Sequence, residues 1–130
     1  MHMKEGKVTE ENIKLLVDSF YNKVRGDKEL SPIFENAIGS DASLWKPHLE
    51  RMYSFWSSIV LSTGSYSGNP FQKHKDLPAF DIKLFDRWLE LFAETTKEIY
   101  TEEISQIFIA KSKNIARSLK LGLYGLETTP

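Results

Sequence analysis

Apolar residues recur at helical spacing in four long stretches of the chain. In the first stretch, after Thr9, the apolar positions step by three and four: Ile13, Leu16, Val17, Phe20, Tyr21 and Val24. Residues three or four apart lie on one face of an α-helix, so the pattern predicts an amphipathic helix with one buried face. Thr9 is a suitable N-cap, two glutamates follow it, and Gly26 marks the end.

A short helix is expected next, over the sequence SPIFENAIG. Ser31 stands before Pro32, and proline suits the first turn of a helix because its missing N–H would have no partner there. Gly39 can end this helix, since glycine accepts the left-handed backbone that follows many helices.

The second long pattern predicts a helix from Asp41 or Ser43 to Thr63, with Gly64 as its stop. Pro47 is expected in the first turn, where proline is tolerated. The stripe expected to face inward comprises Trp45, His48, Leu49, Met52, Trp56, Ile59 and Val60.

The last two long patterns begin at about Asp81 and after Thr101, a second N-cap candidate. The apolar faces of these two helices are Phe85, Trp88, Leu89, Phe92, Thr96 and Ile99 in one, and Ile104, Ile107, Phe108, Ile115 and Leu119 in the other. No convincing strand-like alternation occurs along the chain. We therefore expect a single all-α domain over residues 1–130, in which residues 1–8 form a flexible N-terminal extension.

The sequence SYSGNPFQKHKDLPAF separates the second and third long helices and contains His74. Pro70 can open a short helix here, and Pro78 must end it because the residue before a proline disfavours helical backbone. Phe71 and Leu77 lie three residues to either side of His74, so the three side chains share one face. A histidine held in this way is a candidate metal ligand, and the alternative is an ordinary surface histidine.

Composition and charge exclude several classes of binding partner and of chemistry. The 17 basic and 18 acidic residues form no block of like charge, so neither nucleic acid nor an anionic membrane is expected as a partner. The chain has no cysteine, which excludes disulfides, thiolate catalysis and iron–sulfur clusters. The sequence lacks an apolar run of the ~20 residues needed for a membrane span, and its N-terminus does not resemble a signal peptide. We expect a cytoplasmic protein, and the near-neutral surface favours a monomer.

The usual metal and catalytic motifs fit the chain poorly. A zinc site would need carboxylates to complete it, and the pair His74 and Asp76 is a weak candidate. A di-iron bundle needs Glu-x-x-His, and a serine nucleophile needs Gly-x-Ser-x-Gly, and neither motif occurs.

A haem site requires instead one axial imidazole and a large pocket lined by aromatic side chains. Aromatic residues make up 12% of the chain, and the candidates for this pocket come from several elements: Tyr21, Phe34, His48, Met52, Phe55, Trp56, Phe80 and Trp88. Each of them taken singly is equally explained as a core residue. For His48, which lies on an apolar stripe, a core role, a ligand role and a gating role are all open.

These features together resemble the truncated haemoglobins, and most closely group III. The segments that carry the resemblance are FYNKVRGD, SPIFENAIG, WKPHLERMYSFW, YSGNPFQKHKDLPAF and LFDRWLELF. The string Tyr-x-Gly-x-Pro-x-x-x-His ends at His74, no two glycines adjoin, and His48 together with the ending His-x-Asp-Leu-Pro favours group III. The resemblance implies a two-over-two helical sandwich around one haem b.

The resemblance also implies roles for particular residues. His74 would be the proximal ligand, bonded to iron through Nε2, and Phe34 would lie against the porphyrin face. Tyr21 and Trp88 match the distal pair of hydrogen-bond donors, and His48 would be a distal gate or, alternatively, a sixth ligand. Further haem contacts are expected from Met52, Phe55, Trp56, Phe71, Leu77, Phe80 and Phe85, and propionate contacts from Arg51 and Lys73.

We therefore expect a haem globin that binds O2, NO and CO. Two distal donors would slow ligand release, which favours NO dioxygenation or peroxidase-like chemistry over bulk O2 transport. No nucleotide-binding fingerprint Gly-x-Gly-x-x-Gly occurs, so an enzymatic cycle that consumes electrons would need a separate reductase. The alternative is a haem-free all-α binding or regulatory module whose aromatic pocket takes an apolar ligand or a partner helix.

Overall fold

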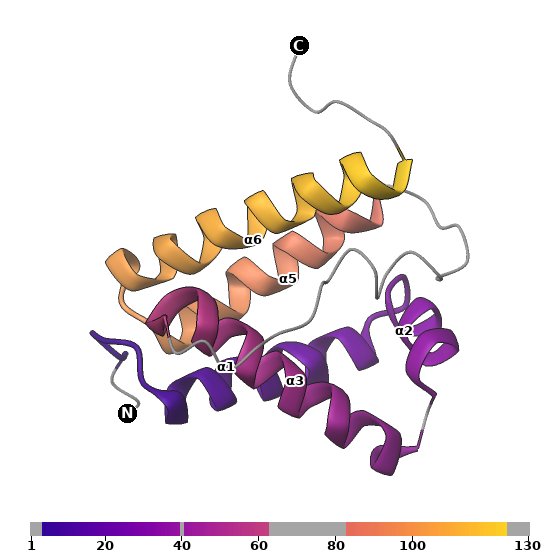
Figure 1. Ribbon diagram of the computed structural model, residues 1–130, viewed down its shortest axis with the longest axis horizontal. Helices are drawn as coiled ribbons and strands as arrows, with labels where there is room; N and C mark the ends of the chain where they lie inside the picture. Colours follow the sequence, from indigo (N-terminus) through magenta and orange to yellow (C-terminus); the bar gives the residue numbers. More distant parts are fainter. Residues whose placement is uncertain (1–3, 40, 63–82, 125–130) are drawn as a thin grey trace.

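The computed structural model describes residues 4–39, 41–62 and 83–124, and in this part of the chain it contains five helices (Figure 1). Their bounds are Glu10–Gly26 for α1, Ser31–Ile38 for α2, Ala42–Leu61 for α3, Leu84–Ile99 for α5 and Glu102–Tyr124 for α6. The predicted all-α class is confirmed, because the described residues contain no strand beyond one isolated bridge between Glu5 and Tyr100.

This bridge ties the N-terminal segment to the turn between α5 and α6. The Glu5 amide donates to the Ile99 carbonyl at 2.8 Å, and the Thr101 amide donates to the Glu5 carbonyl at 3.0 Å. Val8 packs against the main core. Two backbone hydrogen bonds thus hold the chain at Glu5, and flexibility over residues 1–8 stays a prediction.

Helix α1 begins where the sequence predicted, at a capping box. Thr9 Oγ1 accepts from the Asn12 amide at 3.1 Å, and Asn12 Oδ1 accepts from the Thr9 amide at 2.8 Å. Each side chain thus satisfies an amide that has no partner within the helix. The Tyr100 hydroxyl also donates to Asn12 Oδ1, at 2.8 Å, and so links the start of α1 to the end of α5.

Two local expectations differ from the structure. One of them is how α2 starts: it begins at Ser31, before Pro32, as expected, but Ser31 is its first residue, and in the turn before it the Asp27 carboxylate accepts from the Glu29 and Leu30 amides. Pro47 lies beyond the first turn of α3, because this helix begins at Ala42 behind an Asp41 N-cap. Pro47 therefore leaves one carbonyl of α3 without its intrahelical donor.

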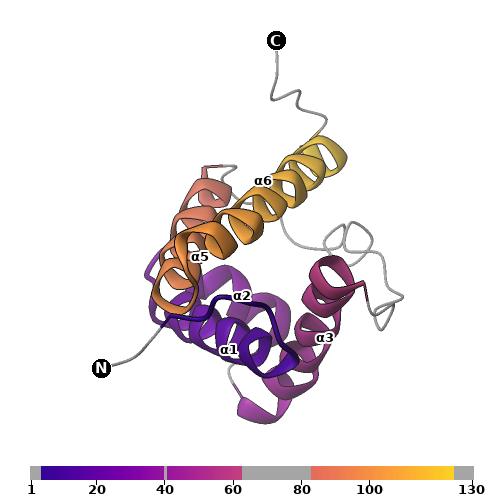
Figure 2. The same cartoon turned by 90° about the vertical axis from the view of Figure 1, so that its left-hand side faces the viewer.

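The helices pack in two pairs. Helices α5 and α6 run side by side in opposite directions, and α1 contacts both α3 and α5. In Figures 1 and 2, α5 and α6 lie above α1 and α3, and α2 lies at the end of α1. None of the helices formed by the described residues is long and apolar enough to cross a membrane.

The main core lies between these pairs and is rich in aromatic rings. Phe92 of α5 stacks on Trp88 on one side, with centroids 5.8 Å apart, and on Trp56 of α3, with centroids 4.9 Å apart. Phe108 of α6 contacts Trp56 at 5.7 Å and Tyr100 at 4.8 Å. Ring-to-ring packing therefore joins α3, α5 and α6.

Candidate functional site

The predicted proximal segment lies outside the described residues. This applies to His74 and to four further site residues: Phe71, Lys73, Leu77 and Phe80. The geometry below concerns the other wall of the predicted site, which α1, α2, α3 and α5 provide.

Tyr21 lies at the centre of this wall. Its side chain is 7% exposed, because it belongs to the face of α1 that turns to the core. Its ring meets that of Phe34 at 5.9 Å and that of His48 at 4.9 Å, both edge to face. The structure therefore brings together three residues that the sequence placed in one site from three different helices.

The Tyr21 hydroxyl makes no hydrogen bond to another described residue. Burial removes water from the hydroxyl and raises its pKa above the ordinary value of 10. The phenol consequently stays protonated and able to donate throughout the physiological pH range.

His48 is held between two aromatic rings. Its imidazole lies edge to face against Tyr21 and against Trp45, with the second pair of centroids 5.6 Å apart. The Nε2 atom of His48 is buried. The predicted gate thus contacts the predicted donor Tyr21 directly.

Trp45 is a member of this cluster that the sequence did not assign to the site. Its indole is 2% exposed, and Nε1 donates to the Gly39 carbonyl at 2.7 Å. The Arg25 guanidinium lies over the ring, 4.7 Å from its centroid, in cation–π geometry. The one available signal was its position three residues before His48 on the same stripe.

Trp88 is half-buried on α5 and contacts the cluster through Phe20. The Phe20 ring lies edge to face against Tyr21 at 4.9 Å and against Trp88 at 5.6 Å. Within the described part of the chain, the Trp88 indole N–H has no hydrogen-bond acceptor. The two predicted donors, Tyr21 and Trp88, thus share one neighbour, and neither donates to another described residue, whereas the Trp45 N–H donates to Gly39.

The other described residues that were predicted to contact the haem do not all lie near Tyr21. Met52 and Phe55 are half-buried against the main core, Trp56 is buried in it, and Arg51 is exposed. Phe85 lies elsewhere, in a small cluster with Ala116 and Leu119 near one end of α5 and α6, although Trp88 packs against that cluster as well.

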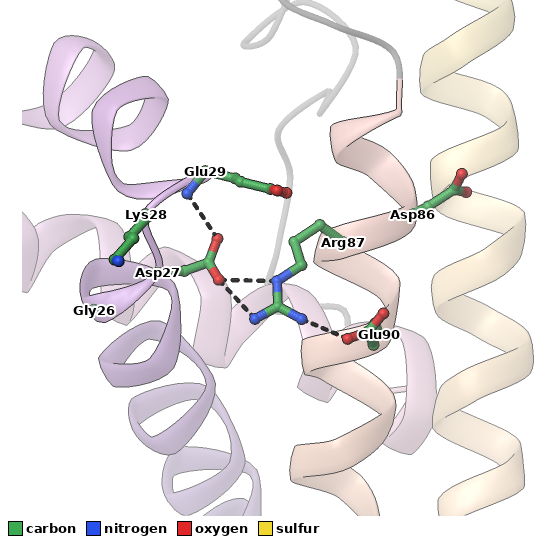
Figure 3. Close-up of a pocket in the computed structure, with 7 residues that line it drawn as sticks. All are labelled: Gly26, Asp27, Lys28, Glu29, Asp86, Arg87 and Glu90. Carbon is green, nitrogen blue, oxygen red and sulfur yellow. Dashed lines mark hydrogen bonds and ion pairs between the residues drawn. The ribbon is translucent and has the colours of Figure 1, made fainter.

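A polar hollow lies where the end of α1 faces the start of α5 (Figure 3). The Arg87 guanidinium bonds to the Asp27 carboxylate, with Nε and Nη2 both 2.8 Å from Oδ1. The sequence offered no sign of this pair, because the two residues are 60 positions apart. Among the residues that the structure describes, no group of three or more His, Asp or Glu side chains could hold a metal ion.

Comparison with known proteins agrees with the fold. No protein-family model matches the sequence. The chain is 40% identical over 122 residues to the group 3 truncated hemoglobin ctb of Campylobacter jejuni subsp. jejuni serotype O:2, a match that covers 94% of this chain and 96% of that protein. A crystal structure of the group III truncated hemoglobin from Campylobacter jejuni is similar with a TM-score of 0.90, at 40% identity over 94% of this chain and 96% of the other. The chain belongs to the group III truncated haemoglobins.

Proposed function

We propose that this chain is a haem globin in which His74 binds the iron and Tyr21 and Trp88 face a diatomic ligand, O2, NO or CO. When bound, the haem supplies an iron with a coordination position for such a ligand. The haem would be of the b type, as in the family resemblance, and a chain without cysteine has no thiol for the thioether links of c-type haem.

The observation that supports this proposal most directly concerns the hydroxyl of the largely buried Tyr21 side chain. Tyr21 is 7% exposed, and its hydroxyl makes no hydrogen bond to another described residue. A donor at the end of a largely buried side chain can be used by a ligand that accepts a hydrogen bond. The available donors of Tyr21 and Trp88 suit a haem pocket, where few polar groups orient the ligand.

The hydrogen-bond donors Tyr21 and Trp88 also indicate which reaction the bound ligand would undergo. A diatomic ligand with partial negative charge on its outer atom accepts hydrogen bonds strongly in a medium of low dielectric constant. Such hydrogen bonds would slow the release of the ligand. Slow release suits NO dioxygenation to nitrate, or activation of peroxide, better than bulk O2 transport. For NO dioxygenation a separate reductase would return the iron to the ferrous state.

The His48 imidazole would act as the gate of the distal side. Its contacts with Tyr21 and Trp45 hold it in the aromatic cluster with Nε2 buried. A rotation of the side chain away from Tyr21 would open a path for the ligand without moving either donor.

Absorption spectroscopy tests the proposal. We expect the purified protein, or the protein reconstituted with hemin, to show a Soret band, and the His74→Ala variant to lose or shift it. The His48→Ala variant is the matched control, because it removes a distal imidazole and should keep the band. A protein that takes up no hemin would instead favour the haem-free binding module.

A further inference from the structure

The Asp27–Arg87 pair fixes the start of α5 against the end of α1. Asp27 follows the last residue of α1, and Arg87 lies in the first turn of α5. The Asp27 side chain is 8% exposed and that of Arg87 34%, so the contact is partly shielded from water. Two guanidinium N–H groups converge on one carboxylate oxygen, which restricts the direction of the Arg87 side chain.

The carboxylate itself cannot shift freely. Its second oxygen accepts from the Glu29 amide at 3.1 Å and from the Leu30 amide at 3.0 Å, as Figure 3 shows for Glu29. These bonds anchor Asp27 to the turn between α1 and α2. Arg87 therefore bonds to an acceptor that is itself held in place. A further nitrogen of its guanidinium, Nη1, pairs with Glu90 on α5.

Arg87 directly precedes Trp88, the predicted distal donor. Successive residues of an α-helix project about 100° apart, so an Arg87 drawn toward α1 sets the rotation of α5 about its axis. That rotation decides how the Trp88 indole lies against Phe20, the ring that Trp88 shares with Tyr21. The side chain of Lys83, the N-cap residue of α5, makes no capping hydrogen bond to the helix.

We propose that Asp27 and Arg87 are positioning residues that aim the Trp88 indole and thereby set the rate at which a bound diatomic ligand leaves. The inference rests on the proposed function, because the ligand lies on the haem. The inference goes beyond the proposed function in one respect: the Asp27–Arg87 ion pair sets the orientation of the donor Trp88. The orientation of the other donor, Tyr21, depends on this ion pair much less.

A second ion pair between the same helices provides the matched control. Lys23 of α1 pairs with Glu98 at 2.8 Å and with Glu94 at 3.4 Å, farther along α5 than Trp88. Loss of this pair should weaken the contact between α1 and α5 without turning the Trp88 indole. A merely structural role for Asp27 and Arg87 would make the variants of both pairs behave alike.

The experiment uses two variants of the pair and the control Lys23→Met. Arg87→Met keeps most of the side-chain stem, and Asp27→Asn keeps an oxygen that can accept from the Glu29 and Leu30 amides, so both should fold. The first readout is the indole N–H signal of Trp88 in the 1H–15N NMR spectrum of the protein as purified, assigned by its loss in Trp88→Phe. We expect this signal to shift in both variants and to stay in place in Lys23→Met.

The second readout is the ligand on the haem, with CO and O2 as probes. In Arg87→Met we expect the C–O stretching frequency to move toward that of Trp88→Phe, and O2 release to rise up to about tenfold, the effect of one lost hydrogen bond. In a Trp88→Phe background, Arg87→Met should add nothing further to either quantity.

The outcomes separate this inference from the proposed function. Absence of a Soret band in the unaltered protein would overturn both, since no ligand on a haem would remain to be released. A Soret band with an unmoved Trp88 signal, or an Arg87→Met effect that persists in full without Trp88, would overturn the positioning role alone.

Discussion

At the scale of single residues, the large polar side chains near Tyr21 differ in whether their N–H or O–H group already donates within the described part of the chain. Trp45 donates to Gly39, and Tyr100 donates to Asn12, so these two large polar side chains serve the fold. Tyr21 and Trp88 have no such partner among the described residues. A ligand that accepts a hydrogen bond could therefore use either donor.

The Tyr21→Phe variant should show whether the Tyr21 hydroxyl serves ligand binding or the stability of the fold. We expect O2 release to rise by about ten- to a hundredfold, the effect of losing a hydrogen bond worth roughly 1.5–3 kcal/mol to a charged acceptor. The free energy of unfolding of the haem-free protein should stay the same or increase, because the lost hydroxyl has no bond to a described residue. Stopped-flow kinetics and urea unfolding measure the two effects.

Tyr100→Phe is the control for that experiment. Its hydroxyl donates to Asn12 at 2.8 Å, so we expect a loss of about 1 kcal/mol of stability and an unchanged O2 release rate. Unchanged release in Tyr21→Phe would remove the phenol from the distal site.

At the scale of elements, the turns between helices place the cluster. The α2–α3 connection passes through Gly39, whose φ of +107° is unfavourable for residues with a side chain, and whose carbonyl accepts from Trp45. This connection brings Phe34 and Trp45 together with stacked rings, 6.3 Å between centroids. The α1–α2 turn depends instead on the Asp27 carboxylate.

Gly39→Ala should therefore destabilise the protein by about 1–3 kcal/mol, the usual range for a strained backbone position. Besides the strain, the added Cβ would lie 2.7 Å from Leu44 Cδ1. Gly26→Ala is the control, because no atom lies within 4 Å of its added Cβ, and it should be neutral or slightly stabilising. Thermal unfolding measures both, and equal effects would show that the Gly39 turn is unimportant.

The Asp27 carboxylate should also make stability depend on pH. Burial acts to raise the pKa of Asp27, but the hydrogen bond and charge of Arg87 and the amides of Leu30 and Glu29 outweigh it and lower the pKa. A lowered pKa in the folded state stabilises the protein above the ordinary carboxyl pKa, and this stabilisation is lost as pH falls through the folded-state value. Asp27→Asn should thus be less stable than the unaltered protein at neutral pH, and the difference should shrink in acid. Urea unfolding across this range measures it, and a difference that does not vary with pH would contradict the role of the charge.

At the scale of the whole molecule, the helices meet through an aromatic core and the haem would complete the packing. Ring contacts connect Tyr21, Phe20, Trp88, Phe92 and Trp56 without interruption. A ligand that binds the folded chain and not the unfolded chain stabilises it by mass action.

Hemin should accordingly raise the melting temperature. At a free concentration of about 100 times Kd, the expected stabilisation is about 2.7 kcal/mol. Calorimetry with and without hemin measures it, with His74→Ala as the control that should lose most of the increase. An equal increase in His74→Ala would mean that hemin binds elsewhere.

The sequence by itself determined the helices and the set of candidate side chains. A repeat of three and four residues, the Thr9 cap and the Gly39 stop involve neighbours along the chain, so α1, α2 and the faces of the other helices could be predicted from local physics. The motif around His74 also indicated the family to which the chain belongs.

Only the tertiary structure decided how those side chains are used. The contact of Arg87 with Asp27, the donation from Trp45 to Gly39 and the position of Phe20 between Tyr21 and Trp88 depend on how helices pack, and residues far apart in sequence carry no local signal of that packing. Pro47 differs from these cases, because its place beyond the first turn has a local cause, the Asp41 side chain that accepts from the Ser43 amide. Periodicity determines which face of a helix turns inward, whereas the partners on that face depend on the relative placement of whole helices.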